Sequence, residues 1–272
     1  MLGKLLKYEF RATARLFLTF YLALIVFALL NAFFSTELLV KLEGSLVHLH
    51  LAGAPGLLYL ILRLLYFALV VGVMVMTLLV MFQRFYQSLL GDEGYLMFTL
   101  PVAPWQHIVS KLLTALVWTV ASSLLALLSV LIITTKVDLR LAWPGLSSAI
   151  GALLHNFGLA GLFLLPAITL AAAIAGILMT YAAITLGHLS TRHRMAATIG
   201  WFFAFQLAFI GLIIALLVLL LPGLIEKYDS ATTPALFFQQ LALQFFLLPS
   251  LALGALSFWL TNFILNRRLN LE

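Results

Sequence analysis

The sequence lacks cysteine altogether and contains very few charged residues. Of its 272 residues, 9% are Asp, Glu, Lys or Arg and 64% are hydrophobic, and the mean hydropathy is +1.17. An ordinary globular domain carries about 25% charged residues. The absence of cysteine excludes disulfides and thiolate metal sites. The shortage of charge excludes a soluble fold, which could not hide this much apolar surface, so an integral membrane protein is expected.

The short motifs that mark catalytic sites are also missing. There is no G-x-x-x-x-G-K-[ST] phosphate loop, no H-E-x-x-H and no G-x-S-x-G. The apolar runs are almost bare of ionisable groups, which intramembrane enzymes and ion-coupled carriers usually need near the membrane midplane. His48 and His50 form an H-x-H pair, but without a third ligand nearby they do not predict a metal site. We therefore expect no catalytic residue, no metal and no cofactor on this chain.

Six apolar runs are long enough to cross a bilayer as helices, which requires roughly 20 residues. The predicted fold is an all-α integral membrane protein with six transmembrane helices in a single transmembrane domain over residues 1–272. A short helix over residues 147–156 is expected to lead into the fourth span. Pro166 and Pro249 fall inside predicted spans and are expected to kink them. The predicted spans are residues 16–34, 57–83, 108–135, 159–187, 199–221 and 239–265.

The distribution of basic residues predicts the orientation. Placing both termini in the cytoplasm puts ten of the 15 Lys and Arg in internal segments, four in external ones and one, Arg63, within a span. Cytoplasmic segments carry the excess of Lys and Arg in most membrane proteins. The net charge of +6 is therefore attributed to cations that flank spans, and no nucleic-acid partner is expected. The expected location is the plasma membrane of a bacterial cell, with an external loop over residues 222–238.

The N-terminal segment, residues 1–15, has the pattern of an amphipathic helix. Leu2, Leu5, Leu6 and Phe10 lie largely on one helical stripe, opposite the basic residues. Such a helix lies in the membrane interface, with its apolar face in the acyl boundary and its cations toward anionic head groups. Such a helix either only anchors and orients the chain, or it also contacts a cytoplasmic partner. The predicted membrane-interface residues are Lys4, Lys7, Arg11 and Arg15.

The largest cytoplasmic loop, residues 84–107, has the pattern of a short helix followed by a tight break. Asp92 is a good helix N-cap, and Glu93 suits the positive end of the helix dipole. Pro101 would end that helix, and Pro104 suits the first turn of the next one. The exposed face would be apolar, so it meets either a protein or the bilayer surface. The residues expected on this face are Tyr95, Met97, Phe98 and Trp105.

Arg63 lies six residues into the second predicted span. An intramembrane charge is a functional-site hypothesis by default. At about 9 Å from the external start of the helix, however, an arginine can also extend to the external head groups. The residue therefore either lines a translocation path or has a structural role at the membrane surface.

The segment 91–113 resembles the ABC-2 type transporter permeases, the membrane subunits of a class of ABC exporters. In that family a Glu-Gly segment is followed by a hydrophobic stretch, a Thr-Pro-Val-Ser-like turn and an apolar run that ends in Gly-Lys or Ser-Lys. The chain departs from this pattern by inserting Leu100 and by having Ala103-Pro104 after the turn. The residues 4–10, KLLKYEF, are typical of the family's interfacial elbow helix. The matching segments are Asp92-Glu93-Gly94, Tyr95-Leu96-Met97-Phe98, Thr99-Leu100-Pro101-Val102 and Ser110-Lys111-Leu112-Leu113.

The resemblance implies a mechanism. Family members dimerise, with a second copy or a paralogue, and sit on two separate ATPase subunits that hold ATP and magnesium. The loop between the second and third spans acts as a coupling helix that docks on the ATPase. For this chain, the resemblance implies that the following residues contact the ATPase partner: Asp92, Glu93, Gly94, Tyr95, Met97, Phe98, Thr99 and Pro101. The expected function is the permease subunit of an ATP-driven exporter of a hydrophobic or amphipathic substrate, such as a drug, a peptide or a lipid. The alternative is a stand-alone carrier or a membrane scaffold without an ATPase.

Overall fold

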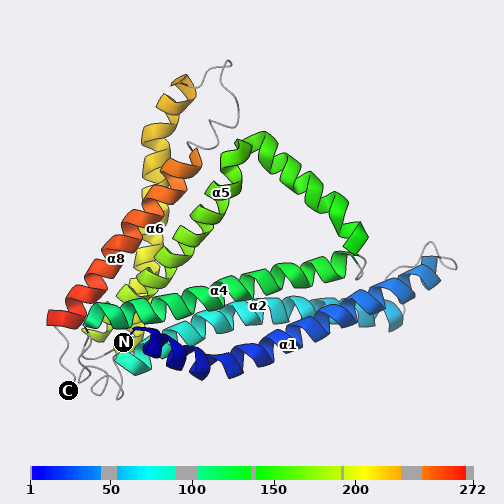
Figure 1. The fold of residues 1–272 in the computed structure, drawn as a ribbon, viewed down its shortest axis with the longest axis horizontal. Helices are drawn as coiled ribbons and strands as arrows, with labels where there is room; N and C mark the ends of the chain where they lie inside the picture. Colours follow the sequence, from blue (N-terminus) through cyan, green and yellow to red (C-terminus); the bar gives the residue numbers. More distant parts are fainter. Residues whose placement is uncertain are drawn as a thin grey trace. The chain divides into compact units, whose positions relative to one another are not determined.

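The computed structural model describes residues 2–43, 54–89, 103–135, 139–190, 193–227 and 241–267. Nearly all of these residues are helical, and no strand occurs among them (Figure 1). Hydrocarbon offers no water to bond backbone amides, so a spanning segment has to satisfy them within its own helix. The elements are α1 (Leu2–Glu43), α2 (Ala54–Leu89), α4 (Pro104–Thr135), α5 (Leu139–His188), α6 (Arg194–Lys227), the π-helical turn η1 (Leu243–Leu247) and α8 (Leu248–Arg267).

All six predicted spans are confirmed as helices long and apolar enough to cross a membrane. The chain is therefore an all-helical, multi-pass membrane protein. The ends of the helical stretches lie within about six residues of the predicted limits, except that the first begins about eleven residues earlier. The spanning stretches are Leu5–Phe33, Leu60–Leu89, Pro104–Thr134, Phe157–His188, Arg194–Gly223 and Leu243–Asn266.

The N-terminal helix predicted over residues 1–15 is not separated from the first span. Instead, α1 runs as one helix from Leu2 to Glu43. The sequence between Lys4 and Glu43 contains neither glycine nor proline, so nothing in it interrupts the helical hydrogen bonding. The boundary expected near residue 15 is therefore absent, and the basic residues extend from the same helix that enters the membrane.

The chain divides into two compact units. The first unit comprises Met1–Leu6, Met81–Leu116 and Ala149–Glu272, and the second comprises Lys7–Val80 and Val117–Ser148. Four helices contribute to both units, because α1, α2, α4 and α5 each cross a boundary between them.

Within the second unit, hydroxyl groups tie α1, α2 and α4 together. Ser122 of α4 shares hydrogen bonds with Tyr21 of α1 (Oη to Oγ, 2.7 Å) and with Thr77 of α2 (Oγ1 to Oγ, 2.9 Å). Tyr66 of α2 and Ser129 of α4 form a similar pair at 2.8 Å. Leu24, Ala28, Tyr66 and Val73 form the buried apolar cluster alongside. Interhelical hydrogen bonds in membranes contribute about 0.6 kcal/mol each and also fix which faces meet.

In the first unit, α8 packs on α5 through small residues. Gly254 faces Ala175, and a Cβ added at Gly254 would stand 3.5 Å from the Ala175 Cα, in ordinary van der Waals contact. Small residues let helix backbones approach closely, which drives helix association in lipid. Four of the buried residues of α8 are small and follow a spacing of four, three and four residues: Ser250, Gly254, Ser257 and Thr261.

A π-helical turn starts the last span. In η1 the Leu248 N–H donates to the Leu243 carbonyl, one residue further back than in an α-helix. Pro249 follows directly, and its ring would clash with the carbonyl four residues before it in a regular helix. The wider turn relieves that clash, so the distortion expected at Pro249 takes the form of a π-bulge.

The interruption in α5 lies at Gly158 instead of at Pro166. Gly158 has φ 63° and ψ −170°, a conformation open almost only to glycine, and it separates two helical stretches. The first stretch contains residues 147–156, where a helix leading into the span was predicted. The second begins at Leu159, the predicted start of the fourth span. The break therefore coincides with the boundary that the apolar pattern indicates.

Replacing Gly158 by alanine is expected to lower the free energy of unfolding by about 1–3 kcal/mol, because a Cβ is strained in that conformation. The matched control is Gly151→Ala in the preceding helical stretch, where an added Cβ would meet nothing within 4 Å. That variant is expected to be neutral or more stable by up to about 1 kcal/mol. Unfolding of the purified protein in a denaturing detergent measures both. Equal changes in the two variants would contradict the account.

Candidate functional site

The predicted coupling loop connects the end of α2 with the start of α4. The helix α2 ends at Leu89, and α4 begins at Pro104, with the Gln106 N–H donating to the Ala103 carbonyl at 2.9 Å. Proline at the first helical position is favoured because its missing N–H has no intrahelical partner anyway. The predicted partner-binding residues lie outside the described residues: Asp92, Glu93, Gly94, Tyr95, Met97, Phe98, Thr99 and Pro101.

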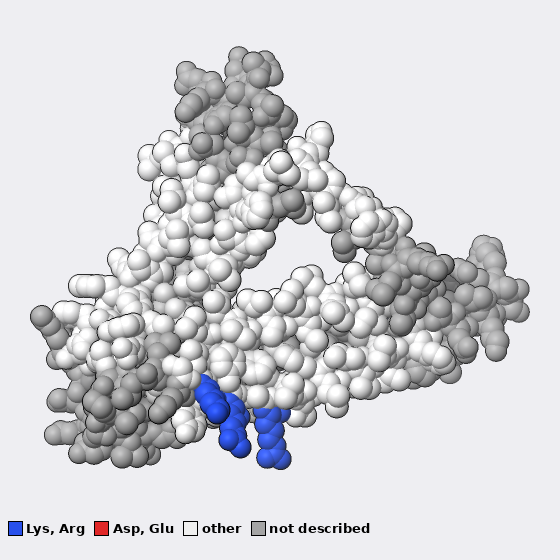
Figure 2. Space-filling model, in the orientation of Figure 1, with Lys and Arg blue, Asp and Glu red and all other residues white. Residues whose placement is uncertain are grey.

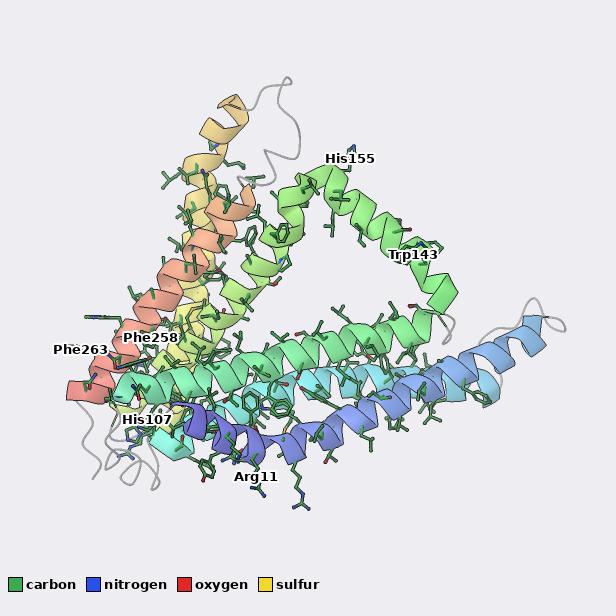
Figure 3. All side chains as sticks on the ribbon, in the orientation of Figure 1. Arg11, His107, Trp143, His155, Phe258 and Phe263 are labelled. Atoms are coloured by element: carbon green, nitrogen blue, oxygen red, sulfur yellow. The ribbon has the colours of Figure 1, made fainter. Side chains whose placement is uncertain are left out.

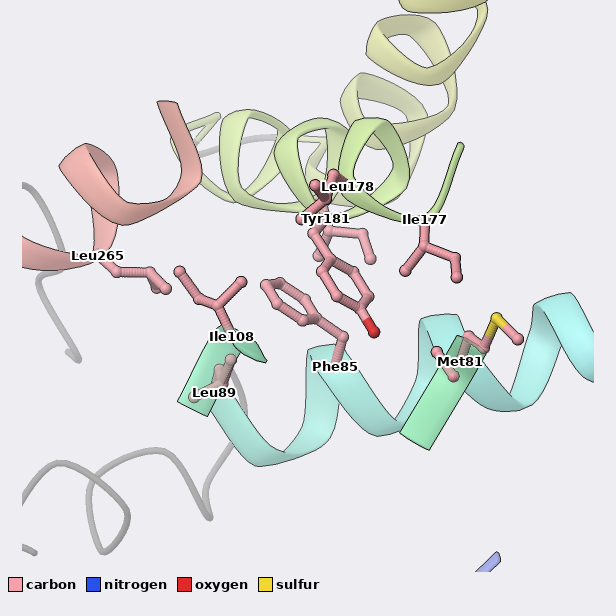
Figure 4. Close-up of a cluster of buried hydrophobic side chains, with 10 residues drawn as sticks. Met81, Phe85, Leu89, Ile108, Ile177, Leu178, Tyr181 and Leu265 are labelled. Carbon is pink, nitrogen blue, oxygen red and sulfur yellow. The ribbon is translucent and has the colours of Figure 1, made fainter. Parts of the chain in front are cut away.

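Both ends of this loop are anchored in one buried cluster, here termed the loop-base core (Figure 4). The ring of Phe85 stacks on that of Tyr181 of α5, with centroids 4.0 Å apart and planes 12° apart. Leu89 and Ile108, close to the two ends of the loop, are completely buried. The core therefore fixes where the loop leaves and re-enters. Its members are Met81, Phe85, Leu89, Ile108, Ala115, Ile177, Leu178, Tyr181, Ile184 and Leu265.

The loop-base core brings together the ends of four helices. It includes the last turns of α2, the first turns of α4, the last turns of α5 and Leu265, near the end of α8. The second connection predicted to be internal, residues 188–198, begins at the same place. There His188 lies edge-on to Tyr86 with ring centroids 6.1 Å apart. Two connections predicted to be internal therefore start from one end of the first unit.

A polar stripe on α4 is buried beside this core. His107, Ser110, Lys111 and Thr114 follow helical spacing and are each at most 5% exposed. Ser110 donates to the His107 carbonyl at 2.9 Å, and Thr114 donates to the Ser110 carbonyl at 2.9 Å. Lys111 belongs to the segment that resembles the permease family, yet it lies inside the protein. The burial of Lys111 was not predicted, although the helical spacing of 107, 111 and 114 indicates a face that packs on a neighbouring helix.

The helices α5 and α6 meet at a very close contact. A Cβ added at Gly187 would lie 2.0 Å from the Thr198 Oγ1 and 2.6 Å from the Thr198 backbone. Thr198 is buried and its hydroxyl donates to the Arg194 carbonyl at 2.9 Å. Only glycine fits at this position, so the contact holds the first turns of α6 against the end of α5.

The predicted membrane-interface residues lie on one exposed stripe of α1. Lys7, Arg11 and Arg15, spaced four residues apart, are exposed, and Figure 2 shows the basic side chains gathered over the N-terminal part of this helix. Arg11 points away from α2 and α4 (Figure 3). The backbone of Lys4 lies in the same helix, but its side chain is outside what the structure describes. The structure thus brings three of the four predicted residues together.

An aromatic cluster lies on the opposite face of α1 at the same level. Trp118 of α4 stacks on Phe17 with ring centroids 4.4 Å apart, and its Nε1–H donates to the Thr13 Oγ1 at 2.9 Å. Phe10 and Tyr21 contact the same indole ring. These contacts fix the rotation of α1, and they are the reason why the basic stripe faces outward.

Arg63 lies far from the basic stripe along the membrane axis. Asn31 of α1 donates to the Leu62 carbonyl at 3.1 Å, so Arg63 is level with residue 31 of α1. Arg15 is 16 residues earlier on α1, or about 24 Å at 1.5 Å per residue. The Arg63 side chain is exposed on α2, near the end of the apolar stretch of α1. This position favours a role at the membrane surface, and the structure does not bring Arg63 together with the other predicted residues.

No protein-family model, curated protein or solved structure matches the chain. Among the side chains that the structure describes, no group of three His, Cys, Asp or Glu could hold a metal ion. His48 and His50 lie outside those residues. The architecture and the geometry of the loop base are therefore the observations on which a function can be argued.

Gly187→Ala is expected to destabilise the protein by several kcal/mol or to prevent assembly of the span, because the added Cβ would overlap the Thr198 backbone. Gly176→Ala, also in α5, is the control, since a Cβ there would meet nothing within 4 Å. Thermal unfolding of the two purified variants distinguishes them. A Gly187→Ala variant as stable as Gly176→Ala would show that α5 and α6 do not approach so closely.

Proposed function

We propose that this chain is the permease subunit of an ATP-driven exporter, with ATP and magnesium bound by a separate ATPase. The observation that carries the proposal is the loop-base core, which ties both ends of the 90–102 segment to α5 and α8. The resemblance of residues 91–113 to the ABC-2 permeases supports it further. A phosphate loop is missing from the sequence, so the ATPase would be another chain.

The loop-base core provides a way to transmit force from a docked loop. A displacement of the 90–102 segment acts on Leu89 and Ile108, the buried residues close to its ends. These pack in one cluster with Tyr181 of α5 and Leu265 of α8. Packed interiors are stiff, so movement at the loop is passed to the spans instead of being absorbed. Closure of the ATPase pair would in this way change the arrangement of the spans and open a path for an apolar or amphipathic substrate.

The docking surface is tested by replacing Tyr95, Met97 and Phe98 together with Asp. The expected result is loss of co-purification with the cognate ATPase and loss of substrate-stimulated ATP hydrolysis, because a helix-in-groove contact depends on its apolar anchors. Truncating a single central anchor of such a contact costs about 2 kcal/mol or more, so a triple change should lower affinity at least thirtyfold.

The matched control is Phe237→Asp in the predicted external loop, which should leave both readouts unchanged. Thermal unfolding checks that the triple variant is folded. Unchanged ATPase binding together with unchanged stimulated hydrolysis would sink the proposal. Transport by the purified chain without any nucleotide would instead favour a stand-alone carrier.

The second permease copy is proposed to pack on α6. No residue in the most apolar part of α6 is buried within its own chain, whereas 17–29% is buried in the other five spans. One exposed stripe of α6 consists only of small residues, at positions where an added Cβ on either glycine would meet nothing within 4 Å. Such stripes allow close approach of a second membrane helix. The stripe comprises Gly200, Ala204, Ala208, Gly211 and Ala215.

Ala208→Leu is expected to remove most of the dimer, because a bulky side chain would hold the two α6 helices apart. Ala172→Leu is the control, since Ala172 is equally exposed on a span, in α5. The dimer fraction is measured by cross-linking in membranes and by light scattering in detergent. Dimers that persist in Ala208→Leu and are lost in Ala172→Leu would place the interface on another helix.

A further inference from the structure

The basic stripe of α1 continues on the same face of the helix, without a break, as an exposed apolar stripe. Lys7, Arg11 and Arg15 are followed on the same face, at spacings of three and four residues, by apolar side chains that are also exposed. The continuation consists of Leu18 (61% exposed), Leu22 (68%), Val26 (46%), Leu29 (43%) and Phe33 (62%). Because α1 is one helix, the depth of each cation relative to the apolar stripe is set by the helical rise.

The helical rise places the three cations at different depths. From Arg15 to Phe33 the axis spans about 27 Å at 1.5 Å per residue, close to the roughly 30 Å of hydrocarbon in a bilayer. Arg15 therefore lies at the inner boundary of the hydrocarbon. Arg11 lies about 6 Å further out and Lys7 about 12 Å further out. A head-group layer is about 5–7 Å thick on each side. Arg15 lies at the hydrocarbon side of this layer, Arg11 lies near its aqueous edge, and Lys7 lies about 5 Å beyond that edge.

The rest of the local structure holds this face toward the lipid. The opposite face of α1 is fixed by Thr13 and Phe17 through their contacts with Trp118. Tyr8, 71% exposed, adds an amphipathic ring near the same level, where tyrosine is enriched in membrane proteins. Glu9 is only partly exposed and lies about half a turn away from Lys7 and Arg11, so it does not neutralise the stripe.

We propose that Arg15 and Arg11 bind the phosphates of anionic phospholipids in the leaflet that α1 enters, with a weaker contribution from Lys7. Each basic residue near an anionic membrane surface contributes about a fivefold preference, which corresponds to about 1 kcal/mol. The inference is independent of the proposed transport function. A bound lipid would fix the vertical position of α1, whose other face carries the hydrogen bonds to α2 and α4.

Lipid is favoured over a protein as the occupant of this surface. The stripe is continuous with an apolar face that has to lie in hydrocarbon in a membrane-spanning helix. A soluble partner that covered Lys7 would have to displace head groups to reach Arg15. A phosphate group, in contrast, lies at the level of Arg15 and Arg11 wherever lipid surrounds the helix, and guanidinium groups match phosphate in charge and geometry.

The test measures binding of phosphatidylglycerol and phosphatidylcholine to the full chain, purified in a neutral detergent, by native mass spectrometry. The wild type is expected to prefer phosphatidylglycerol. Arg15→Gln and Arg11→Gln should each lower that preference about fivefold, whereas Lys7→Gln should lower it less than about twofold. Arg15→Lys retains the charge and should retain most of the preference. Thermal unfolding of each variant checks that it is folded.

Three results would overturn the proposal. One is an Arg11→Gln/Arg15→Gln double variant, folded, that prefers phosphatidylglycerol as strongly as the wild type. Another is an equal loss for Lys7→Gln and Arg15→Gln, because a helix lying flat in the interface would place all three cations at one depth. The third is unchanged lipid preference together with loss of a co-purifying protein from the double variant, which would make the stripe a protein contact.

Discussion

Backbone hydrogen bonding in hydrocarbon is the constraint on which the rest of this structure depends. Because lipid cannot bond a peptide group, each of the six spans closes its own backbone bonds as a helix. Apolar surface then gives little reason for helices to associate, since lipid covers it equally well. Specific association comes from hydroxyl pairs such as Tyr21 with Ser122 in the second unit, and from close contacts such as Gly254 with Ala175 in the first.

The loop-base core makes one end of the first unit different from the rest of that unit. Phe85 and Tyr181 stack where α2 ends, α4 begins and α5 ends, so one end of the first unit is densely packed around two loop origins. The outward surface of α6, in contrast, has almost no packing within the chain. A packed core at the ends of two connections, together with an apolar helix that has no buried residue in its most apolar part, is an arrangement that suits the proposed subunit of a larger membrane complex.

Much of the fold was predictable from composition and periodicity, because apolar runs in a chain so poor in charge have few alternatives to membrane helices. The fourth span was predicted to start at residue 159, which is where the second helical stretch of α5 begins after Gly158. The continuous α1 was not predicted, because the basic and apolar stripes of residues 1–15 suggested a separate helix, although no glycine or proline lies between Lys4 and Glu43. The burial of Lys111 and the Phe85–Tyr181 stack depend on which helices meet, which helical periodicity alone does not determine. The coupling-loop residues stay a prediction.

The central proposal, that the 90–102 loop lies in the cytoplasm together with the 188–198 connection, is tested most directly by thiol labelling. The chain contains no cysteine, so single-cysteine variants at Ser45, Glu93, Thr191 and Thr232 each carry one reactive group. In intact cells a membrane-impermeant maleimide should label the variants at Ser45 and Thr232. It should label those at Glu93 and Thr191 only after the cells are permeabilised. Labelling of Glu93→Cys in intact cells would contradict the account.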